Sequence, residues 1–314
     1  MNLVMGVDSG GTKTLLALAN RQGDLAGYWQ GKTLDPAADP HWDTALDHLL
    51  RQAAPLLPRL AAASFGLPRH GEMEEDSRRQ EQVIARLISV PAQVDNDVRI
   101  AFDGALGGEA GVLILAGTGS MAWSSRNRPR DRHYRVGGWG EDIGDEGSAY
   151  WIGLQAITAV CRHLDGRTDA PALCQTLCQH FDIVPDQLIT WFFGLGMQRR
   201  ERVASLARPV AALAEAGDVA AQTLLHQAAA QLAEQLLAAW GRLDLPGPPR
   251  WSYAGGVFNS SLMRNAVSES VGRPPAPPRL PPVGGALLRA ALQAGWQVDD
   301  GWIDRLARQL NQQQ

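Results

Sequence analysis

Cysteine is scarce in this chain of 314 residues, which contains only Cys161, Cys174 and Cys178. So low and odd a count argues against the disulfide framework of a secreted domain and suits a reducing compartment. Cys174 and Cys178 are spaced to share one face of a helix, but no second pair of ligands accompanies them. We therefore interpret them as half-buried helix cysteines rather than as a zinc site.

Long apolar runs are also absent. No stretch approaches the roughly 20 uncharged apolar residues that span a bilayer, and Asp8 falls where a signal peptide would be apolar. Lysine occurs only as Lys13 and Lys32, and the formal net charge is −4 with a pI of about 6.0. Without an excess of positive charge, nucleic acid is a poor partner. We expect a cytoplasmic protein that binds neither membrane nor nucleic acid.

The length favours two domains, and 45% hydrophobic residues suffice for two cores. The two halves begin alike. In the first, an apolar strand at 3–7 precedes a Gly-rich turn at 8–12; in the second, a strand at 111–115 precedes a turn at 116–120. A further strand candidate follows each turn, which indicates an internal duplication.

The rest of the second half is predicted to be mainly helical. Helical spacing covers residues 147–164, 172–181, 199–216 and 220–242. A proline-rich break then leads to a strand at 250–254 and the pair Gly255–Gly256. This pair is either an ordinary strand-to-helix turn or a flat surface for adenine or ribose. The whole pattern predicts an α/β protein with a helix-rich C-terminal half.

Both Gly-rich turns have the composition of an anion site. Glycine permits positive φ and close approach, so that backbone N–H groups can surround a phosphate. Asp8 beside the first turn suits the Mg²⁺ that accompanies phosphates. The first turn is not a P-loop, because Thr12 stands where the Walker lysine belongs. Hairpin turns without any ligand remain the alternative.

Residues 137–148 contain five glycines and four carboxylates in twelve positions. Asp145 stands where a helix is predicted to begin, so it either caps that helix or accepts hydrogen bonds from a polar ligand. A mobile acidic surface loop is the alternative. Trp139 and Ile143 argue against such a loop, because they would have nothing to pack against.

Asp97 lies where a predicted strand at 91–95 gives way to a helix. A carboxylate there can align an attacking hydroxyl and accept its proton late in phosphoryl transfer. The alternative role is a plain helix N-cap. Asp95 is the nearest competitor, but strand alternation turns its side chain away from that of Asp97.

These segments resemble the N-acetylglucosamine kinase family, which also contains the ATPase activators of benzoyl-CoA reductase. The matching segments are Gly6–Thr12, Asn96–Asp97, Ala116–Ser120, Gly137–Gly140, Gly144–Trp151 and Ala254–Phe258. They occur in the family's order over most of the chain, and Gly144–Trp151 is the most specific of them.

The resemblance implies a two-domain actin-like ATPase fold, which is a duplicated ribonuclease H-like architecture with an interdomain cleft. We place the domains at 1–109 and 110–299, with a final helix at about 300–314 returning to the first. The implied reaction is ATP- and Mg²⁺-dependent phosphorylation of the 6-hydroxyl of N-acetylglucosamine, with a homodimer left open.

The resemblance also implies residue roles. Asp97 would be the catalytic base, and Asp8 would bind Mg²⁺ through water. The nucleotide and phosphate residues would be Gly10, Gly11, Thr12, Lys13, Gly117, Thr118, Gly255 and Gly256. The substrate residues would be Ser120, Gly138, Trp139 and Asp145.

The chain departs from the family at 34–40, which lacks the usual Asn. An Asp there would suit a cationic sugar, so a glucosamine kinase is the first alternative. An ATP-dependent activator of a partner enzyme is the alternative of another class, although activators hold an iron–sulfur cluster through cysteines and these three fall within predicted helices. A degenerate kinase that only binds sugar is opposed by Asp8, Thr12 and Asp97.

Overall fold

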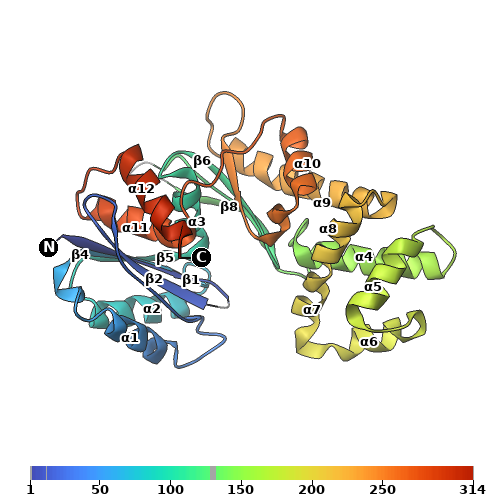
Figure 1. Cartoon of the computed structure of the whole chain (residues 1–314), viewed down its shortest axis with the longest axis horizontal. Coiled ribbons are helices and arrows are strands. Elements are labelled where there is room, and N and C mark those ends of the chain that lie inside the picture. Colours follow the sequence, from blue (N-terminus) through green and yellow to red (C-terminus); the bar gives the residue numbers. More distant parts are fainter. Residues whose placement is uncertain (1, 12, 128–131, 314) are drawn as a thin grey trace. The chain divides into compact units, whose positions relative to one another are not determined.

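The computed structural model describes residues 2–11, 13–127 and 132–313 (Figure 1). The chain forms two compact units. The first unit comprises Met1–Ala110 with Pro277–Gln314, and the second comprises Gly111–Ala276. Each unit has its own sheet and its own buried core. No helix of the described residues is long and apolar enough to cross a membrane.

The sheet of the first unit has the strand order β3-β2-β1-β4-β5. Its strands are β1 Leu3–Ser9, β2 Lys13–Asn20, β3 Leu25–Lys32, β4 Leu60–Leu67 and β5 Ala92–Asn96. The first three strands form an antiparallel meander, whereas β4 and β5 run parallel to β1. The carboxyl ends of β1, β4 and β5 therefore meet at one edge of the sheet.

Helices cover both faces of this sheet. They are α1 Trp42–Gln52, α2 Glu74–Leu87, α3 Asp97–Leu106, α11 Pro282–Gln293 and α12 Asp300–Asn311. Met5 and Val7 of β1 pack in the core with α1 and α2, whereas Val4 packs in the core with α11 and α12. Because both faces are covered, β1 is apolar on both sides.

Helix α11 returns the chain to the first unit, where Figure 1 shows it in red beside the blue strands. The approach is close, since a Cβ on Gly285 would lie 2.0 Å from the carbonyl oxygen of Ile100. A Cβ on Gly6 of β1 would lie 2.7 Å from the backbone nitrogen of Leu287. The chain returns to the first unit at Pro277, earlier than the return at about residue 300 that was expected from the sequence. The proline-rich segment before α11 carries no signal of which core the helix joins.

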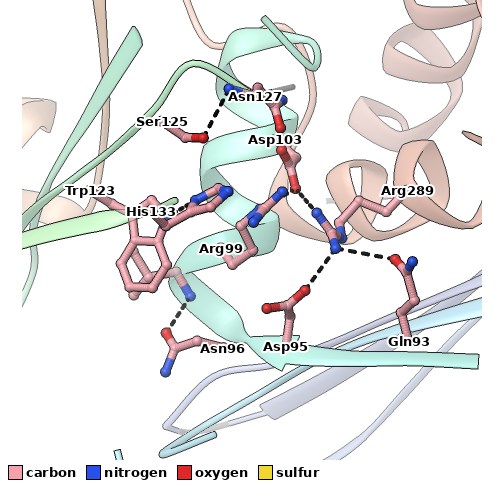
Figure 2. A network of polar contacts seen from close by, with 11 residues as sticks. Gln93, Asp95, Asn96, Arg99, Asp103, Trp123, Ser125, Asn127, His133 and Arg289 are labelled. Atoms are coloured by element: carbon pink, nitrogen blue, oxygen red, sulfur yellow. Dashed lines mark hydrogen bonds and ion pairs between the residues drawn. The ribbon is translucent and has the colours of Figure 1, made fainter. Parts of the chain in front are cut away.

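A buried polar network fixes α11 to β5 and α3 (Figure 2). Arg289 donates to Asp95 at 2.8 Å, to Asp103 at 2.9 Å and to Gln93 at 3.1 Å. Arg99 of α3 also donates to Asp103, which is 1% exposed. Asp95 is thereby bound on the α11 side of β5 and serves packing.

The second unit repeats the first in its sheet, which has the order β8-β7-β6-β9. The strands are β6 Gly111–Ala116, β7 Ser120–Ser125, β8 Tyr134–Gly137 and β9 Trp251–Ala254. Again three strands form an antiparallel meander and the fourth runs parallel to the first. The topology matches β3-β2-β1-β4, as expected for an internal duplication.

Most of the second unit is helical, as predicted. The helices are α4 Ala149–Leu164, α5 Pro171–Phe181, α6 Leu188–Gly194, α7 Arg199–Ser205, α8 Ala207–Glu215, α9 Val219–Gly241 and α10 Ser261–Val271. The single helix expected at 199–216 is two helices that meet at Leu206. Pro209 explains the break, because it has no N–H to donate to Ser205 and its ring crowds that carbonyl.

Replacing Gly285 by Ala should destabilise the first unit, because the added methyl overlaps the backbone of α3. We expect a loss of about 2 kcal/mol or more in urea unfolding. Gly301→Ala in α12 is the matched control, since its Cβ would meet only Asp299, at 3.4 Å. Equal stability of Gly285→Ala and the wild type would disprove this account of the helix contact.

Candidate functional site

Two carboxylates lie at the carboxyl edge of the first sheet. Asp8 in β1 is in register with Gly66 in β4, and Gly66 is in register with Asp95 in β5. Asp97 begins α3 directly after β5. The carboxyl ends of parallel strands are the usual ligand-binding edge of an open α/β sheet.

Both carboxylates have raised pKa values. Burial raises the pKa of Asp8 to about 7; the charge of Asp97 adds to the effect and Lys13 opposes it. Burial raises the pKa of Asp97 to about 6, with further contributions from Glu72 and Asp35. A cation bound between such groups would favour their charged forms.

Asn96, rather than Asp97, is the N-cap of α3. The Asn96 side chain accepts a hydrogen bond from the backbone N–H of Val98 at 3.0 Å. It also donates to the carbonyl of His70 at 3.1 Å. Asp97 occupies the first helical turn, where the positive end of the helix favours a negative charge. The helix is therefore capped by Asn96 and does not need Asp97 for this purpose, although Oδ1 of Asp97 also accepts a hydrogen bond from the N–H of Val98.

The first Gly-rich turn is open on its outer side. Gly10 donates its N–H to the carbonyl of Lys13, and a Cβ on Gly10 or Gly11 would meet no atom within 4 Å. Neither glycine has the positive φ that the sequence analysis expected. Because their surroundings are open, the absence of a side chain at these two glycines would let a ligand approach the backbone closely. Thr12 lies outside the described residues.

The segment after β3 is bound to this turn. Thr33 donates its hydroxyl to the carbonyl of Gly10 at 2.7 Å, and the N–H of Leu34 donates to the Ser9 hydroxyl at 2.8 Å. Asp35 accepts a hydrogen bond from the N–H of Ala37. The unusual 34–40 segment is thus placed beside the turn, near enough for Asp35 to raise the pKa of Asp97.

The turn after β6 rests on the start of α4 in the second unit. The N–H groups of Ala149 and Tyr150 donate to the carbonyls of Gly117 and Thr118, at 2.9 and 3.2 Å. Ser120 donates its hydroxyl to the carbonyl of Glu146 at 2.7 Å. A Cβ on Gly117 would meet no atom within 4 Å. The turn is thus fixed at its base and open at its tip.

Asp145 is 3% exposed and adopts a left-handed φ of 58°. Its carboxylate accepts from Nη2 of Arg200 at 2.9 Å and from the N–H of Ser120 at 3.4 Å. The cap of α4 is Ser148, whose hydroxyl accepts from Trp151. The structure therefore brings Ser120 and Asp145 together, and Asp145 is not the N-cap of α4.

The acidic loop itself differs from expectation. Gly138 has a positive φ of 71°, which glycine tolerates at no cost. Trp139 is 72% exposed and Ile143 is 77% exposed. The inference that these two apolar side chains pack against something was wrong. Their exposure leaves the Trp139 ring accessible to a ligand.

A cavity of about 930 Å³ lies in the second unit, within the range of ligand pockets. Gly117, Thr118 and Gly256 contribute to its wall. Gly255 has a φ of 99°, and a Cβ there would lie 2.3 Å from the carbonyl oxygen of Ala116. The turns after the parallel strands β6 and β9 therefore adjoin each other at this cavity.

The helical part of the cavity wall was not predicted from the sequence. Its polar members are His180, Glu201, Ser205, Arg208, Glu215, Asn259 and Ser260. Most lie on amphipathic helices, where charged and polar residues are indistinguishable from an ordinary solvent face. Only the tertiary fold shows that they border a cavity.

The profile of the BadF/BadG/BcrA/BcrD ATPase family matches residues 5–290. The chain belongs to this family. Its curated relatives include an N-acetylmuramic acid/N-acetylglucosamine kinase of Clostridium acetobutylicum, 28% identical over 74% of this chain and 77% of the relative. An N-acetyl-D-glucosamine kinase of Dictyostelium discoideum is 24% identical over 86% of this chain and 90% of the relative.

Solved structures share the fold of this ATPase family member. A candidate N-acetylglucosamine kinase from Chromobacterium violaceum has a TM-score of 0.70 at 24% identity, covering 92% of this chain and 98% of that one. A ROK family glucokinase from Streptomyces griseus, in complex with glucose and AMPPNP, has a TM-score of 0.58 at 16% identity, with the same coverage. The two-domain, duplicated α/β fold expected from the sequence is confirmed.

Family membership implies use of ATP, and the site residues fit a nucleotide with its metal. The described residues contain no group of three or more His, Cys, Asp and Glu side chains that could hold a metal. Mg²⁺ does not need one, because it is usually bound by one or two carboxylates, waters and substrate phosphates. Asp8, whose buried charge is unfavourable without a cation, fits that requirement.

Asp8→Asn should change the dependence of stability on pH. The pKa of Asp8 rises from 3.8 to about 7 on folding, so between these values the folded protein binds more protons than the unfolded chain. Its free energy of unfolding therefore falls as pH rises, by at most about 4 kcal/mol. The variant should be more stable than the wild type at pH 8 and not at pH 4, measured by urea unfolding. The same pH dependence in both proteins would disprove the burial argument.

Gly256→Leu should block the cavity without disturbing the fold. A Cβ on Gly256 would meet no atom within 4 Å, and the residue has no positive φ. We expect the Kd for ATP, measured by calorimetry, to rise at least about tenfold with an unchanged melting temperature. Gly241→Leu is the control, since Gly241 is equally unhindered and does not line the cavity. Equal ATP affinity in both variants would exclude this cavity as the nucleotide site.

Proposed function

We propose that this protein is an ATP-dependent kinase that phosphorylates the 6-hydroxyl of N-acetylglucosamine. The observation that carries the proposal is Asp97, a partly buried carboxylate with a pKa raised to about 6 at the same sheet edge as Asp8. The names of the relatives in Clostridium acetobutylicum and Dictyostelium discoideum support the reaction class and the sugar.

Asp97 acts as the base in this proposal. With a pKa of about 6 it is largely ionised at neutral pH, so it accepts a hydrogen bond from the sugar hydroxyl and aligns it. Because the transition state of phosphoryl transfer is loose, alignment contributes more than early removal of the proton. Asp97 receives the proton as the new phosphate ester forms.

Asp8 would hold Mg²⁺ through water, and the metal would supply positive charge to the phosphates. The open turn at Gly10 and Gly11 would let those phosphates approach the backbone closely, with Lys13 adding charge. In the second unit, Gly117, Thr118, Gly255 and Gly256 would border the nucleotide. Ser120, Gly138, Trp139 and Asp145 would bind the sugar. The exposed ring of Trp139 offers an apolar face to a sugar ring.

Glucosamine is the second candidate substrate. Asp35 and Glu72 both lie near enough to Asp97 to raise its pKa, so the surroundings of the base are acidic. A cationic amino group would relieve this repulsion, whereas an acetamido group would not. A glucosamine kinase of Vibrio cholerae, 27% identical over 61% of this chain and 65% of the relative, supports this candidate.

A coupled ADP-release assay should be run with N-acetylglucosamine, glucosamine, glucose, N-acetylmannosamine and no sugar. We expect turnover with N-acetylglucosamine; preference for glucosamine would give Asp35 a role in specificity. Sugar-independent ATP hydrolysis would favour the activator function.

The three free cysteines, Cys161, Cys174 and Cys178, lie in helices of the second unit. An iron assay on the purified protein would test that alternative.

Asp97→Asn should lower kcat by about 10²- to 10⁴-fold while leaving ATP binding nearly intact, because it removes the proton acceptor and keeps the shape. Asp95→Asn is the control. It changes a neighbouring carboxylate that is bound to Arg289, and it should cost stability rather than turnover. Near-normal turnover of Asp97→Asn would refute the assignment of the base.

A further inference from the structure

Arg200 is the principal partner of Asp145. Its Nη2 donates to Oδ2 of Asp145 at 2.9 Å, whereas the N–H of Ser120 reaches Oδ1 only at 3.4 Å. Since Asp145 is 3% exposed, water contributes little to holding its carboxylate. The direction of this buried carboxylate therefore depends mainly on one guanidinium group.

The guanidinium of Arg200 also binds a second carboxylate of the acidic loop. Its Nε lies 3.2 Å from Oε2 of Glu141. The planar fork of the guanidinium presents different nitrogens to Asp145 and Glu141, an arrangement that a lysine could not reproduce, although the contact with Glu141 is an ion pair without hydrogen-bond geometry. Arg200 thus links two of the four carboxylates of this loop, Glu141 and Asp145, to α7.

The ion pair is packed directly on the turn after β6. A Cβ on Gly119 would lie 2.7 Å from Oδ2 of Asp145 and 2.9 Å from Nη2 of Arg200. Helix α7, which carries Arg200, is itself held close to α4, because a Cβ on Gly153 would lie 2.0 Å from the carbonyl oxygen of Val203. Arg200 is therefore presented from a closely packed element.

We infer that Arg200 is a positioning residue for the acceptor sugar. It holds the Asp145 carboxylate in one orientation, and the small part of the Asp145 side chain that stays exposed, 4%, is where a lone pair accepts a hydrogen bond from a sugar hydroxyl. The inference rests on the proposed function, in which Asp145 binds the sugar. Arg200 acts only through Asp145 and takes no part in phosphate transfer.

Helix α7 supplies an internal test of this role. Glu201, Ala204 and Ser205 of the same helix line the cavity of about 930 Å³, where the proposed function puts the nucleotide. A substitution that merely displaced α7 would therefore raise the KM for ATP as well as that for the sugar. A positioning role predicts a change in the sugar KM alone.

The experiment compares steady-state kinetics of Arg200→Gln, Arg200→Lys and Arg199→Gln with both substrates varied. Arg200→Gln should raise the sugar KM at least about tenfold, with the KM for ATP nearly unchanged. Arg200→Lys should restore part of the loss, because it returns the charge without the fork. Arg199→Gln is the matched control, since the one ion pair of Arg199 within the described part of the chain is with the exposed Asp142, at 3.6 Å.

A double-mutant cycle then shows whether Arg200 acts through Asp145. In the background of Asp145→Asn, Arg200→Gln should raise the sugar KM no further. An unchanged sugar KM in Arg200→Gln, a parallel rise in the KM for ATP, or additive effects would each overturn the inference. Absence of sugar-dependent turnover in the wild type would overturn the proposed function and this inference with it. Failure of the proposed function is seen in the wild type before any variant is made, so it can be distinguished from failure of the inference about Arg200.

Discussion

The close packing of α11 against β1 and α3 is the constraint on which the first unit depends. Gly6, Gly104 and Gly285 lack side chains at the points of contact, and a Cβ on any of them would lie within 3.0 Å of backbone. Arg289 then fixes α11 to β5 and α3 through charged hydrogen bonds. Since β1 carries Asp8 and α3 carries Asp97, a helix from the C-terminal part of the chain sets the spacing of the two carboxylates.

The same unit treats its buried charges in two different ways. The buried Asp103 and the partly buried Asp95 are each bound to Arg289, so the charges of both are compensated. Asp8 and Asp97, among the described residues, have no cation within 4 Å, and burial raises the pKa of both. Uncompensated burial of this kind lowers stability and is typical of functional sites, where a ligand supplies the missing charge.

Much of the fold followed from local sequence patterns. Apolar strands that end in Gly-rich turns occur in both halves, and these local signals predict the duplicated meander and the edge that carries Asp8. Contacts between distant segments could not be predicted in this way. Arg200 and Asp145 are 55 residues apart in sequence, and Arg289 and Asp95 are 194 apart. In the sequence alone, neither arginine can be distinguished from the other arginines on the polar faces of predicted helices. The exposure of Trp139 was mispredicted for the same reason, because burial depends on neighbours that composition does not reveal.

The two copies of the repeated sheet differ in their candidate sites. The connection before the fourth strand, which is β4 in the first unit and β9 in the second, explains the difference. In the first unit, the single helix α1 lies between β3 and β4, whereas in the second unit α4 to α9 lie between β8 and β9. The first unit carries the carboxylates Asp8 and Asp97 at the carboxyl edge of its sheet. In the second unit, α4, α5, α7, α8 and α9 of the long insertion supply walls around the turns after β6 and β9. The cavity is therefore a product of the insertion, and the turns alone, which the two units share, do not create it.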